Sequence, residues 1–206
     1  MNRIHWRTTA RFGEIQVKEF ELEQTADAWI FLDLEGAREA GVGDRSTTEV
    51  AVRAAASIAE KAIGENRAVG VTISAHRTTI LPADRGGRQR LKILQLLAAV
   101  EADGRTPLAE ALIANVGRMR RGMTAIVITA SDDPGFVRPL ASLRSRGIPV
   151  AVVYLDPPAF DPGSADDPEA EARRQRSRAV RHTLSEYEVP IFVIGPDRPL
   201  SEALGR

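Results

Sequence analysis

The chain of 206 residues is long enough for one α/β domain with a sizeable core, and its 43% hydrophobic and 27% charged residues are typical of a globular protein rather than of a disordered, collagen-like or membrane-spanning chain. The 28 lysines and arginines balance the 28 aspartates and glutamates, so no net charge draws the whole surface toward nucleic acid or anionic lipid. Cysteine is absent, which excludes disulfides, thiolate catalysis and cysteine-based zinc sites and suits a reducing compartment.

Strand-like segments recur along the chain. The first, Glu14–Glu21, alternates apolar and polar side chains and predicts an edge strand with one face in water. The later segments are continuous runs of valine, isoleucine and aromatic residues, as expected for parallel strands that helices cover on both faces. These runs are Ala28–Leu34, Ala68–Ser74, Thr124–Thr129 and Pro149–Leu155, with Ile191–Ile194 expected as a last strand.

Two helices are expected between the first strands and the middle of the chain. Ser46 and Glu49 have the spacing of a capping box, and they predict a helix that ends near Gly64. A second helix is expected over Arg88–Ala102, before the turn residues that follow it. The side chains expected on its buried side are Leu91, Leu94, Leu97 and Ala98.

Two further helices are expected around the third core strand. Thr106 suits the N-cap and Pro107 the first position of a helix that continues to about Met119. The segment Gly135–Arg146 is expected to form the helix that crosses over to the next parallel strand.

The last third of the chain begins with a segment, Asp156–Pro168, that is dense in proline, aspartate and glycine. These residues disfavour helix interiors and strand pairing, so a long mobile loop is expected there. An arginine-rich helix is expected to follow over Glu169–Tyr187. The alternation of strands and helices predicts one α/β domain over residues 1–206, built in three layers with a mostly parallel sheet between helices.

The first part of the chain resembles the signature that opens the domain-of-unknown-function-58 family. The resemblance lies in Arg3–Arg11 (RIHWRTTAR) and Val17–Glu21 (VKEFE), and it continues to a strand ending at Asp33 and to Thr106–Pro107. It implies a von Willebrand factor A-like domain with Rossmann-like topology, in which residues 1–27 form the family-specific signature and an edge strand. The signature residues are His5, Trp6, Arg11, Lys18 and Glu19.

The same resemblance implies a degenerate metal site. In functional von Willebrand A domains, an Asp-x-Ser-x-Ser loop, a threonine and a further aspartate surround one Mg²⁺ with the oxygen ligands that hard cations prefer. Here Glu35 and Ala37 stand in place of the two serines, and Ala130 stands where the aspartate would directly follow its strand. We therefore expect no cofactor, with Mg²⁺ as the alternative. The remaining candidate ligands are Asp33, Glu35, Thr106 and Asp132.

Two interpretations of these polar loop residues remain open. Either Glu35, Asp132 or Asp133 re-forms a metal shell, or these residues cap helices and turns, and the second interpretation is favoured. With or without an ion, the carboxyl ends of parallel strands are where open α/β sheets present binding surfaces. Partner contacts are therefore expected at Asp33, Glu35, Thr106, Ser131, Asp132 and Asp133.

The resemblance implies a non-enzymatic protein–protein interaction module. Family members typically carry two transmembrane helices upstream and are often encoded near MoxR-type AAA+ ATPases, so such an ATPase or another envelope-associated protein is the expected partner. No stretch approaches the roughly 20 apolar residues that a spanning helix needs, and the N-terminus lacks the apolar core of a signal peptide. We expect the soluble part of a membrane-anchored bacterial protein, on the cytoplasmic face, with membrane contact only through upstream segments.

Nucleic-acid binding is not expected. The arginines within residues 173–181 are interpreted as a solvated helix face that pairs with Glu169 and Glu171.

The alternative function is a nucleotide- or small-ligand-binding enzyme domain that uses the loop Gly41–Ser46. This loop runs into a helix after a strand, but it matches the G-x-G-x-x-G pattern only weakly, and several residues separate Asp33 from Gly41. The chain contains no phosphate-binding Gly-Lys-Ser/Thr loop, no G-x-S-x-G nucleophile elbow and no His-Glu-x-x-His pair. Its histidines, His5, His76 and His182, lie far apart in the sequence and are interpreted as structural or solvated.

Overall fold

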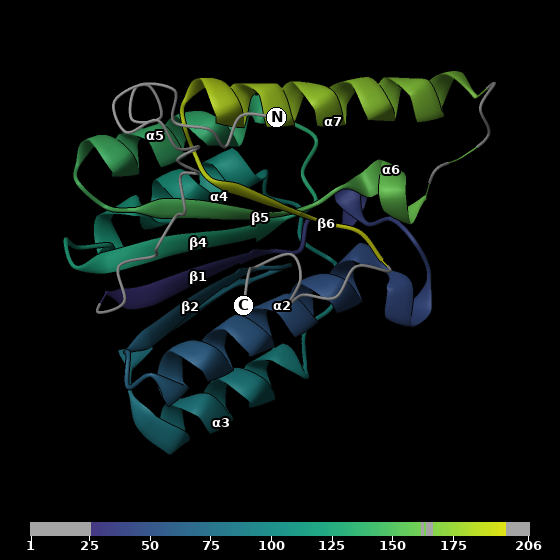
Figure 1. Ribbon diagram of the computed structural model, residues 1–206. Helices are drawn as coiled ribbons and strands as arrows, with labels where there is room; N and C mark the ends of the chain where they lie inside the picture. Colours follow the sequence, from purple (N-terminus) through teal and green to yellow (C-terminus); the bar gives the residue numbers. More distant parts are fainter. Residues whose placement is uncertain (1–25, 162, 164–166, 197–206) are drawn as a thin grey trace, which may run out of the picture.

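The computed structural model describes residues 26–161, 163 and 167–196, which form a six-stranded sheet with helices on both faces (Figure 1). The strand order is β3-β2-β1-β4-β5-β6, and within the described sheet only β3 runs antiparallel to its neighbour. The predicted mostly parallel sheet is confirmed. The strands are β1 (Asp27–Asp33), β2 (Val69–Ser74), β3 (Thr78–Asp84), β4 (Met123–Thr129), β5 (Val150–Leu155) and β6 (Ile191–Ile194).

The helices form two outer layers. In Figure 1, α2 (Thr47–Gly64) and α3 (Gly86–Leu97) lie on one face of the sheet, and α4 (Leu108–Asn115), α5 (Val137–Ser145) and α7 (Pro168–Glu186) lie on the other. The predicted capping box begins α2, because the Ser46 hydroxyl accepts a hydrogen bond from the Glu49 amide at 3.2 Å. The short elements are η1 (Gly36–Arg38), η2 (Gly43–Arg45), η3 (Val116–Arg118), η4 (Pro134–Phe136) and α6 (Pro157–Phe160).

Strand β1 shows why its sequence is continuously apolar. Ile30 and Leu32 belong to the core under α2 and α3, whereas Trp29 and Phe31 belong to the core under α4, α5 and α7. Both faces of the strand are buried, as the continuous run predicted. On the neighbouring strand, Gly70 lies opposite Trp29, and a Cβ at Gly70 would lie only 2.7 Å from the indole ring.

Strand β3 was not predicted from the sequence. It pairs antiparallel with β2 at the edge of the sheet, and most of its residues are exposed. It contains Pro82, beside a register shift opposite Val69–Val71 of β2. An exposed edge strand needs no continuous apolar run, so its composition resembled that of a loop. The predicted edge strand Glu14–Glu21 and the signature residues lie outside the described residues.

The second helix differs from its prediction. Helix α3 ends at Leu97 rather than at residue 102, and Leu91 and Ala98, which were expected to be buried, are exposed. The buried stripe is narrower and consists of Gln89, Ile93 and Leu97. Gln89 replaces an apolar residue there because its amide donates hydrogen bonds to the carbonyl groups of Val69 and Pro82, at 2.7 and 2.8 Å.

The third helix begins one residue later than predicted. Pro107 has an extended ψ of 140° and is the N-cap of α4, so Thr106 lies before the cap. A proline ring fixes only φ, and this value of ψ is why Pro107 does not take the first helical position.

Part of the predicted mobile loop Asp156–Pro168 is also helical. Pro157–Phe160 forms the single turn α6, because a proline suits the first helical position and the buried Phe160 ring anchors the turn to the core. Residues 162 and 164–166 of this loop lie outside the described residues.

Two loops cross closely at the carboxyl edge of the sheet. The Gly36 amide donates to the Gly104 carbonyl at 3.0 Å, and the Gly104 amide donates to the Leu34 carbonyl at 2.9 Å. A Cβ on Gly36 would lie 2.5 Å from the carbonyl oxygen of Ala102, and one on Gly104 would lie 2.7 Å from that of Leu34. Both glycines are therefore needed for the loop after β1 to lie against the loop before α4.

The close crossing predicts the effect of Gly104→Ala. The new methyl group meets backbone atoms that cannot rotate away, so the unfolding free energy measured in urea should fall by about 1–3 kcal/mol. Gly64→Ala is the matched control, because a Cβ there meets nothing within 4 Å and alanine suits a helix better than glycine. Equal stability of the two variants would contradict the crossing.

Candidate functional site

The ends of the neighbouring strands β1 and β4 bring together two buried polar side chains. The Thr129 hydroxyl donates to Asp33 Oδ2 at 2.6 Å, and the Glu35 amide donates to Asp33 Oδ1 at 3.3 Å. The Thr129 hydroxyl oxygen also accepts a hydrogen bond from the Ser131 amide at 2.8 Å. Both carboxyl oxygens of Asp33 thus accept hydrogen bonds from within the protein, and the residue is buried from solvent.

The environment of Asp33 disfavours its ionised form. Burial raises the pKa of Asp33 to about 6 from an ordinary 3.8. The Thr129 hydrogen bond opposes this rise, the Glu35 carboxylate adds to it, and the guanidinium of Arg38 lowers the pKa. The carboxyl group therefore changes charge close to neutral pH.

A second buried carboxylate, Asp132, is held between two arginines. Arg38 Nη1 donates to Asp132 Oδ1, and Arg176 Nε donates to Asp132 Oδ2 at 2.5 Å. The Asp132 side chain is only 6% exposed, so these arginines supply the positive charge that a buried carboxylate needs. Arg176 also donates to Glu169 at 2.9 Å, and Glu169 and Asp132 together raise the pKa of Arg176.

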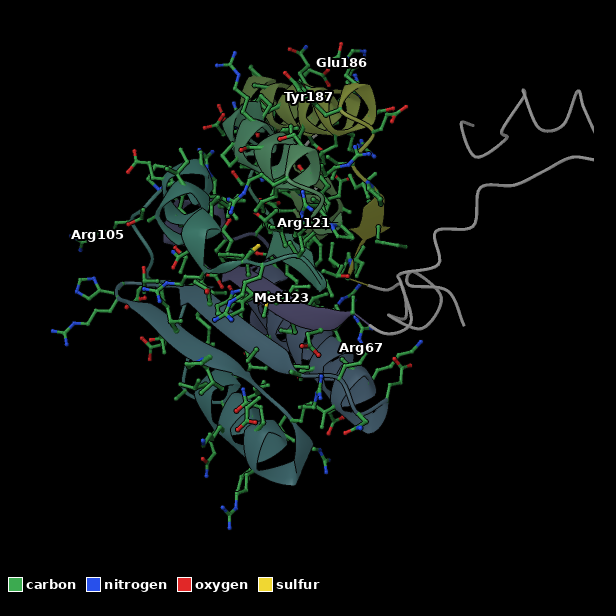
Figure 2. The ribbon with its side chains drawn as sticks, turned by 90° about the vertical axis from the view of Figure 1, so that its left-hand side faces the viewer. Arg67, Arg105, Arg121, Met123, Glu186 and Tyr187 are labelled. Atoms are coloured by element: carbon green, nitrogen blue, oxygen red, sulfur yellow. The ribbon has the colours of Figure 1, made fainter. Side chains whose placement is uncertain are left out.

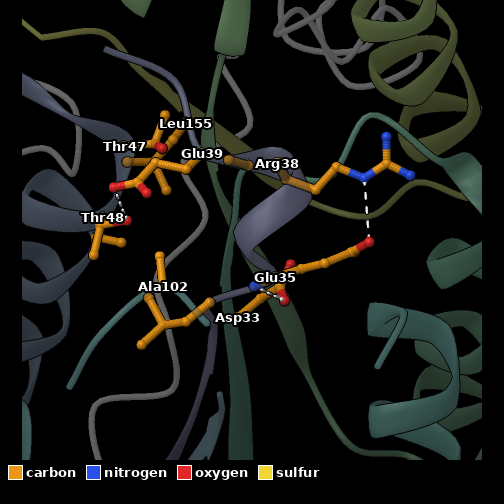
Figure 3. Close-up of a pocket in the computed structure, with 11 residues that line it drawn as sticks. Asp33, Glu35, Arg38, Glu39, Thr47, Thr48, Ala102 and Leu155 are labelled. Carbon is orange, nitrogen blue, oxygen red and sulfur yellow. Dashed lines mark hydrogen bonds and ion pairs between the residues drawn. The ribbon is translucent and has the colours of Figure 1, made fainter. Parts of the chain in front are cut away.

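Arg38 connects the two carboxyl-bearing loops. Its Nε lies 3.5 Å from Glu35 Oε1, while its Nη1 contacts Asp132 on the loop after β4. Figure 3 shows the Glu35 carboxylate directed toward the Arg38 guanidinium, with the Glu35 main-chain nitrogen next to Asp33. We call the set Asp33, Glu35, Arg38, Thr129 and Asp132 the strand-end site.

The structure assembles some of the predicted site residues and separates others. Asp33, Glu35 and Asp132 lie in the strand-end site, and Ser131 is buried beside it. Asp133 is a turn cap, since its carboxylate accepts from the Gly135 amide at 2.9 Å. Thr106 is exposed, and among the described residues its hydroxyl has no hydrogen-bond partner.

Three residues of this region were not found by sequence reasoning. Thr129 was predicted only as the end of a strand, and Arg38 was not singled out. Arg176 belongs to the arginine-rich segment, whose expected pairing with Glu169 and Glu171 is present at Arg176 and Arg174. The one available signal was the i, i+3 spacing of Glu35 and Arg38 on the loop after β1.

The hollow above the strand-end site is small. It is lined by residues of the loop after β1 and of α2, and its cavity volume of about 10 Å³ is comparable to one water molecule. A wider and more open groove of about 480 Å³ lies beside it, lined by Glu35, Gly36, Ala37, Asp103, Gly104 and Arg105. The surface is therefore shallow rather than an enclosed substrate pocket.

The donor set does not fit a divalent cation. Both oxygens of Asp132 accept hydrogen bonds from arginines, and the Arg38 guanidinium already carries positive charge between Glu35 and Asp132. Ala37 and Ala130 offer no side-chain oxygen. Within the part of the chain that the structure describes, no three acidic, histidine or cysteine side chains are grouped as a metal site would require.

In the loop Gly41–Ser46, the amide groups nearest to α2 are already paired. The amides of Arg45, Ser46 and Thr47 donate to the carbonyl groups of Val42, Gly43 and Ala40. The Ser46 hydroxyl caps α2. A phosphate-binding loop needs the amides at the start of its helix free to point at the ligand, and the pairing of these three amides next to α2 does not favour the nucleotide-binding alternative.

The raised pKa of Asp33 predicts a pH-dependent gain from Asp33→Asn. Because the folded-state pKa of Asp33 lies above the unfolded value, protonated Asp33 favours the folded state. This contribution to stability is fully present below about pH 4, decreases as the pH rises, and is lost above about pH 6. At pH 7.5 the unfolding free energy of the neutral variant, measured in urea, should therefore exceed that of the native chain by about 1–3 kcal/mol. This difference should become smaller as the pH falls toward 4. A gain that does not change with pH would contradict this assignment.

Comparison with known proteins agrees with the architecture. The chain is 26% identical over 162 residues to an uncharacterized protein of Mycobacterium tuberculosis and to one of Mycobacterium bovis, matching 76% of this chain but 51% of theirs. It thus spans about half the length of these relatives. Among the described residues, no helix has the length and apolar character to cross a bilayer.

Two solved structures share the fold. The conserved hypothetical protein BatB of Bacteroides thetaiotaomicron matches with a TM-score of 0.56 and 19% identity over 82% of this chain and 90% of that one. An aerotolerance-related membrane protein of Bacteroides fragilis matches with a TM-score of 0.54 and 22% identity over 82% and 91%. The three-layer fold is von Willebrand factor A-like, as are these two neighbours. The model of the family described as "Protein of unknown function DUF58" matches residues 1–185, and the chain belongs to this family.

Proposed function

We propose that this chain is a non-enzymatic protein-binding module whose strand-end surface contacts its partner without a metal ion. The observation that carries the proposal is the position of Arg38, whose guanidinium bridges Glu35 and Asp132 between the ends of β1 and β4. An arginine is always charged, so the site keeps its positive charge at any concentration of divalent cations. In the degenerate metal site, the Arg38 guanidinium thus takes the place of the metal cation.

The shape of the strand-end surface supports binding rather than catalysis. The hollow over Asp33 has room for about one water molecule, and the neighbouring groove is open. Enzymes usually enclose their substrates in deep pockets with converging polar groups. In the strand-end site the polar groups are directed at one another, and this arrangement favours a stable docking surface.

The loop Gly41–Ser46 gives this surface an apolar contact. Val42 is 89% exposed between two glycines with left-handed φ values of +81° and +58°. The loop is held in place because the Thr47 amide and hydroxyl bond to the carbonyl and amide of Ala40, at 2.8 and 3.0 Å. A partner that covers Val42 would gain the free energy of burying it without the cost of ordering the loop.

We further propose a membrane-anchored parent protein, with a MoxR-type AAA+ ATPase as the partner of the strand-end surface. The support is the family to which the chain belongs, the greater length of the mycobacterial relatives, and the description of the Bacteroides fragilis neighbour as a membrane protein. In this arrangement the domain lies on the cytoplasmic side, where the ATPase and its nucleotide are found.

Val42→Asp tests the partner surface. A charge at this exposed position should weaken binding to a purified MoxR-type ATPase from the same organism about tenfold or more, measured by calorimetry, because it must be desolvated on contact. Leu91→Asp is the matched control, since Leu91 is 57% exposed on α3, away from the strand ends. Equal binding by both variants would refute this surface, and absence of binding by the native chain would refute this partner.

Thermal melting tests whether Arg38 takes the place of a metal ion in the strand-end site. The native chain should melt at the same temperature with and without millimolar Mg²⁺, Mn²⁺ or Ca²⁺, because Arg38 already neutralises the carboxylates. Arg38→Met should lower the unfolding free energy by about 1–3 kcal/mol, since Asp132 keeps only Arg176, and should make melting sensitive to these ions. Arg105→Met, in the open groove, is the control. A native chain stabilised by Mg²⁺ would contradict the proposal.

A further inference from the structure

The opposite edge of the sheet carries a group of exposed arginines. Arg118, Arg120 and Arg121 precede β4, and Arg146 ends the helix that precedes β5. The strands are parallel, so these two loops lie next to each other at the amino-terminal edge. We call these four exposed residues the basic edge, and they lie at the opposite ends of the strands from the strand-end site.

Contacts between the two loops fix the basic edge. Arg121 Nε donates to the Arg146 carbonyl at 3.3 Å, and Arg146 Nη1 donates to the Val116 carbonyl at 3.4 Å. Gly147 has a φ of +79°, and a Cβ there would lie 3.7 Å from Arg121 Nε, so the guanidinium lies directly over the glycine. Figure 2 looks onto this edge and shows Arg121 facing the viewer together with Met123.

The basic edge is not neutralised by carboxylates of the described residues. Other arginines near the amino-terminal ends of the strands have such partners: Arg67 pairs with Glu65, Arg85 with Asp27, and Arg144 with Glu188. Among the described residues, no ion pair joins any of the four basic-edge arginines to an acidic side chain. The whole chain has no net charge, so this excess of positive charge is local.

Helix termini explain only part of this arrangement. The carboxyl ends of α4 and α5 point toward this edge, and cations near such ends stabilise helices. Arg118 and Arg146 lie close to these ends, but Arg120 and Arg121 lie beyond η3 in the connection to β4. Their charges are therefore available to an anionic ligand.

We propose that the basic edge docks on the phosphate groups of anionic phospholipids. This inference rests on the membrane anchoring proposed above. Guanidinium groups bind phosphate oxygens in pairs, and clusters of about four to eight basic residues near a membrane anchor are sufficient to attract an anionic leaflet. Asp27, where the described chain enters β1, lies at this same edge, so the connection to an upstream anchor joins the described sheet on the side of the basic edge.

Vesicle sedimentation of the full chain tests the proposal. The chain should bind vesicles that contain phosphatidylglycerol but not vesicles of phosphatidylcholine alone, and added salt should weaken binding. Reversing two charges with Arg120→Glu and Arg121→Glu should reduce binding about tenfold or more. Arg88→Glu with Lys92→Glu, exposed on α3, makes the same change of charge elsewhere and should reduce binding much less.

Three outcomes would overturn the lipid assignment: no binding to anionic vesicles, equal loss in both double variants, or tighter basic-edge-dependent binding to a short DNA duplex than to vesicles. Circular dichroism of the double variants establishes that they are folded. The partner proposal is tested separately, because Val42→Asp should leave vesicle binding unchanged. A chain that loses only vesicle binding in the basic-edge variant keeps the partner surface intact.

Discussion

The carboxyl edge of this sheet depends on one buried carboxylate with two arginine partners. Asp132 follows β4, Arg38 follows β1 and Arg176 lies on α7, so a single group connects three segments that are distant in the sequence. A buried charge without partners costs several kcal/mol, and this cost fixes the positions of both arginines. The strand ends, the first loop and the last helix are thereby held in one arrangement.

Asp33, the other buried carboxyl group of the site, has different hydrogen-bond partners. Asp33 has a hydroxyl and an amide as its hydrogen-bond donors, and Arg38 lowers its pKa less than burial raises it. Neighbouring strand ends therefore hold one carboxylate that is paired with two arginines and one that is protonated in mildly acidic solution. An ion with several oxygen ligands would have stabilised both in the same way, whereas one guanidinium serves mainly the carboxylate it touches.

The sequence was sufficient for the elements whose burial is uniform. Continuous apolar runs located the parallel strands, and the Ser46 capping box located the start of α2, because both depend on local pattern. Strand β3 and the buried face of α3 depend on position at the sheet edge instead. Leu91 is exposed and Gln89 buried because two backbone carbonyls face the helix, and no periodicity in the sequence reveals those carbonyls.

The site was predictable to a similar extent. Asp33 and Asp132 were located through the resemblance to von Willebrand A metal loops, and the rule that open α/β sheets bind at the carboxyl ends of their strands placed them at one edge. Arg38 and Arg176 were not, because arginine side chains are long and a basic residue in a loop or helix has many acidic groups within reach. Which carboxylates it contacts is decided by the tertiary fold, and Arg176 contacts both the buried Asp132 and the exposed Glu169.

The irregular pairing of β3 bears on self-association of the protein through the edge of its sheet. Exposed strand edges can recruit strands from other chains, and proteins resist this with prolines and irregular pairing at the edge. Pro82 lacks an amide proton, and the register shift opposite it disturbs the regular spacing of the outer groups. Both features disfavour the addition of a further strand along the described edge of β3, where a sheet rich in valine and isoleucine would otherwise offer a regular template.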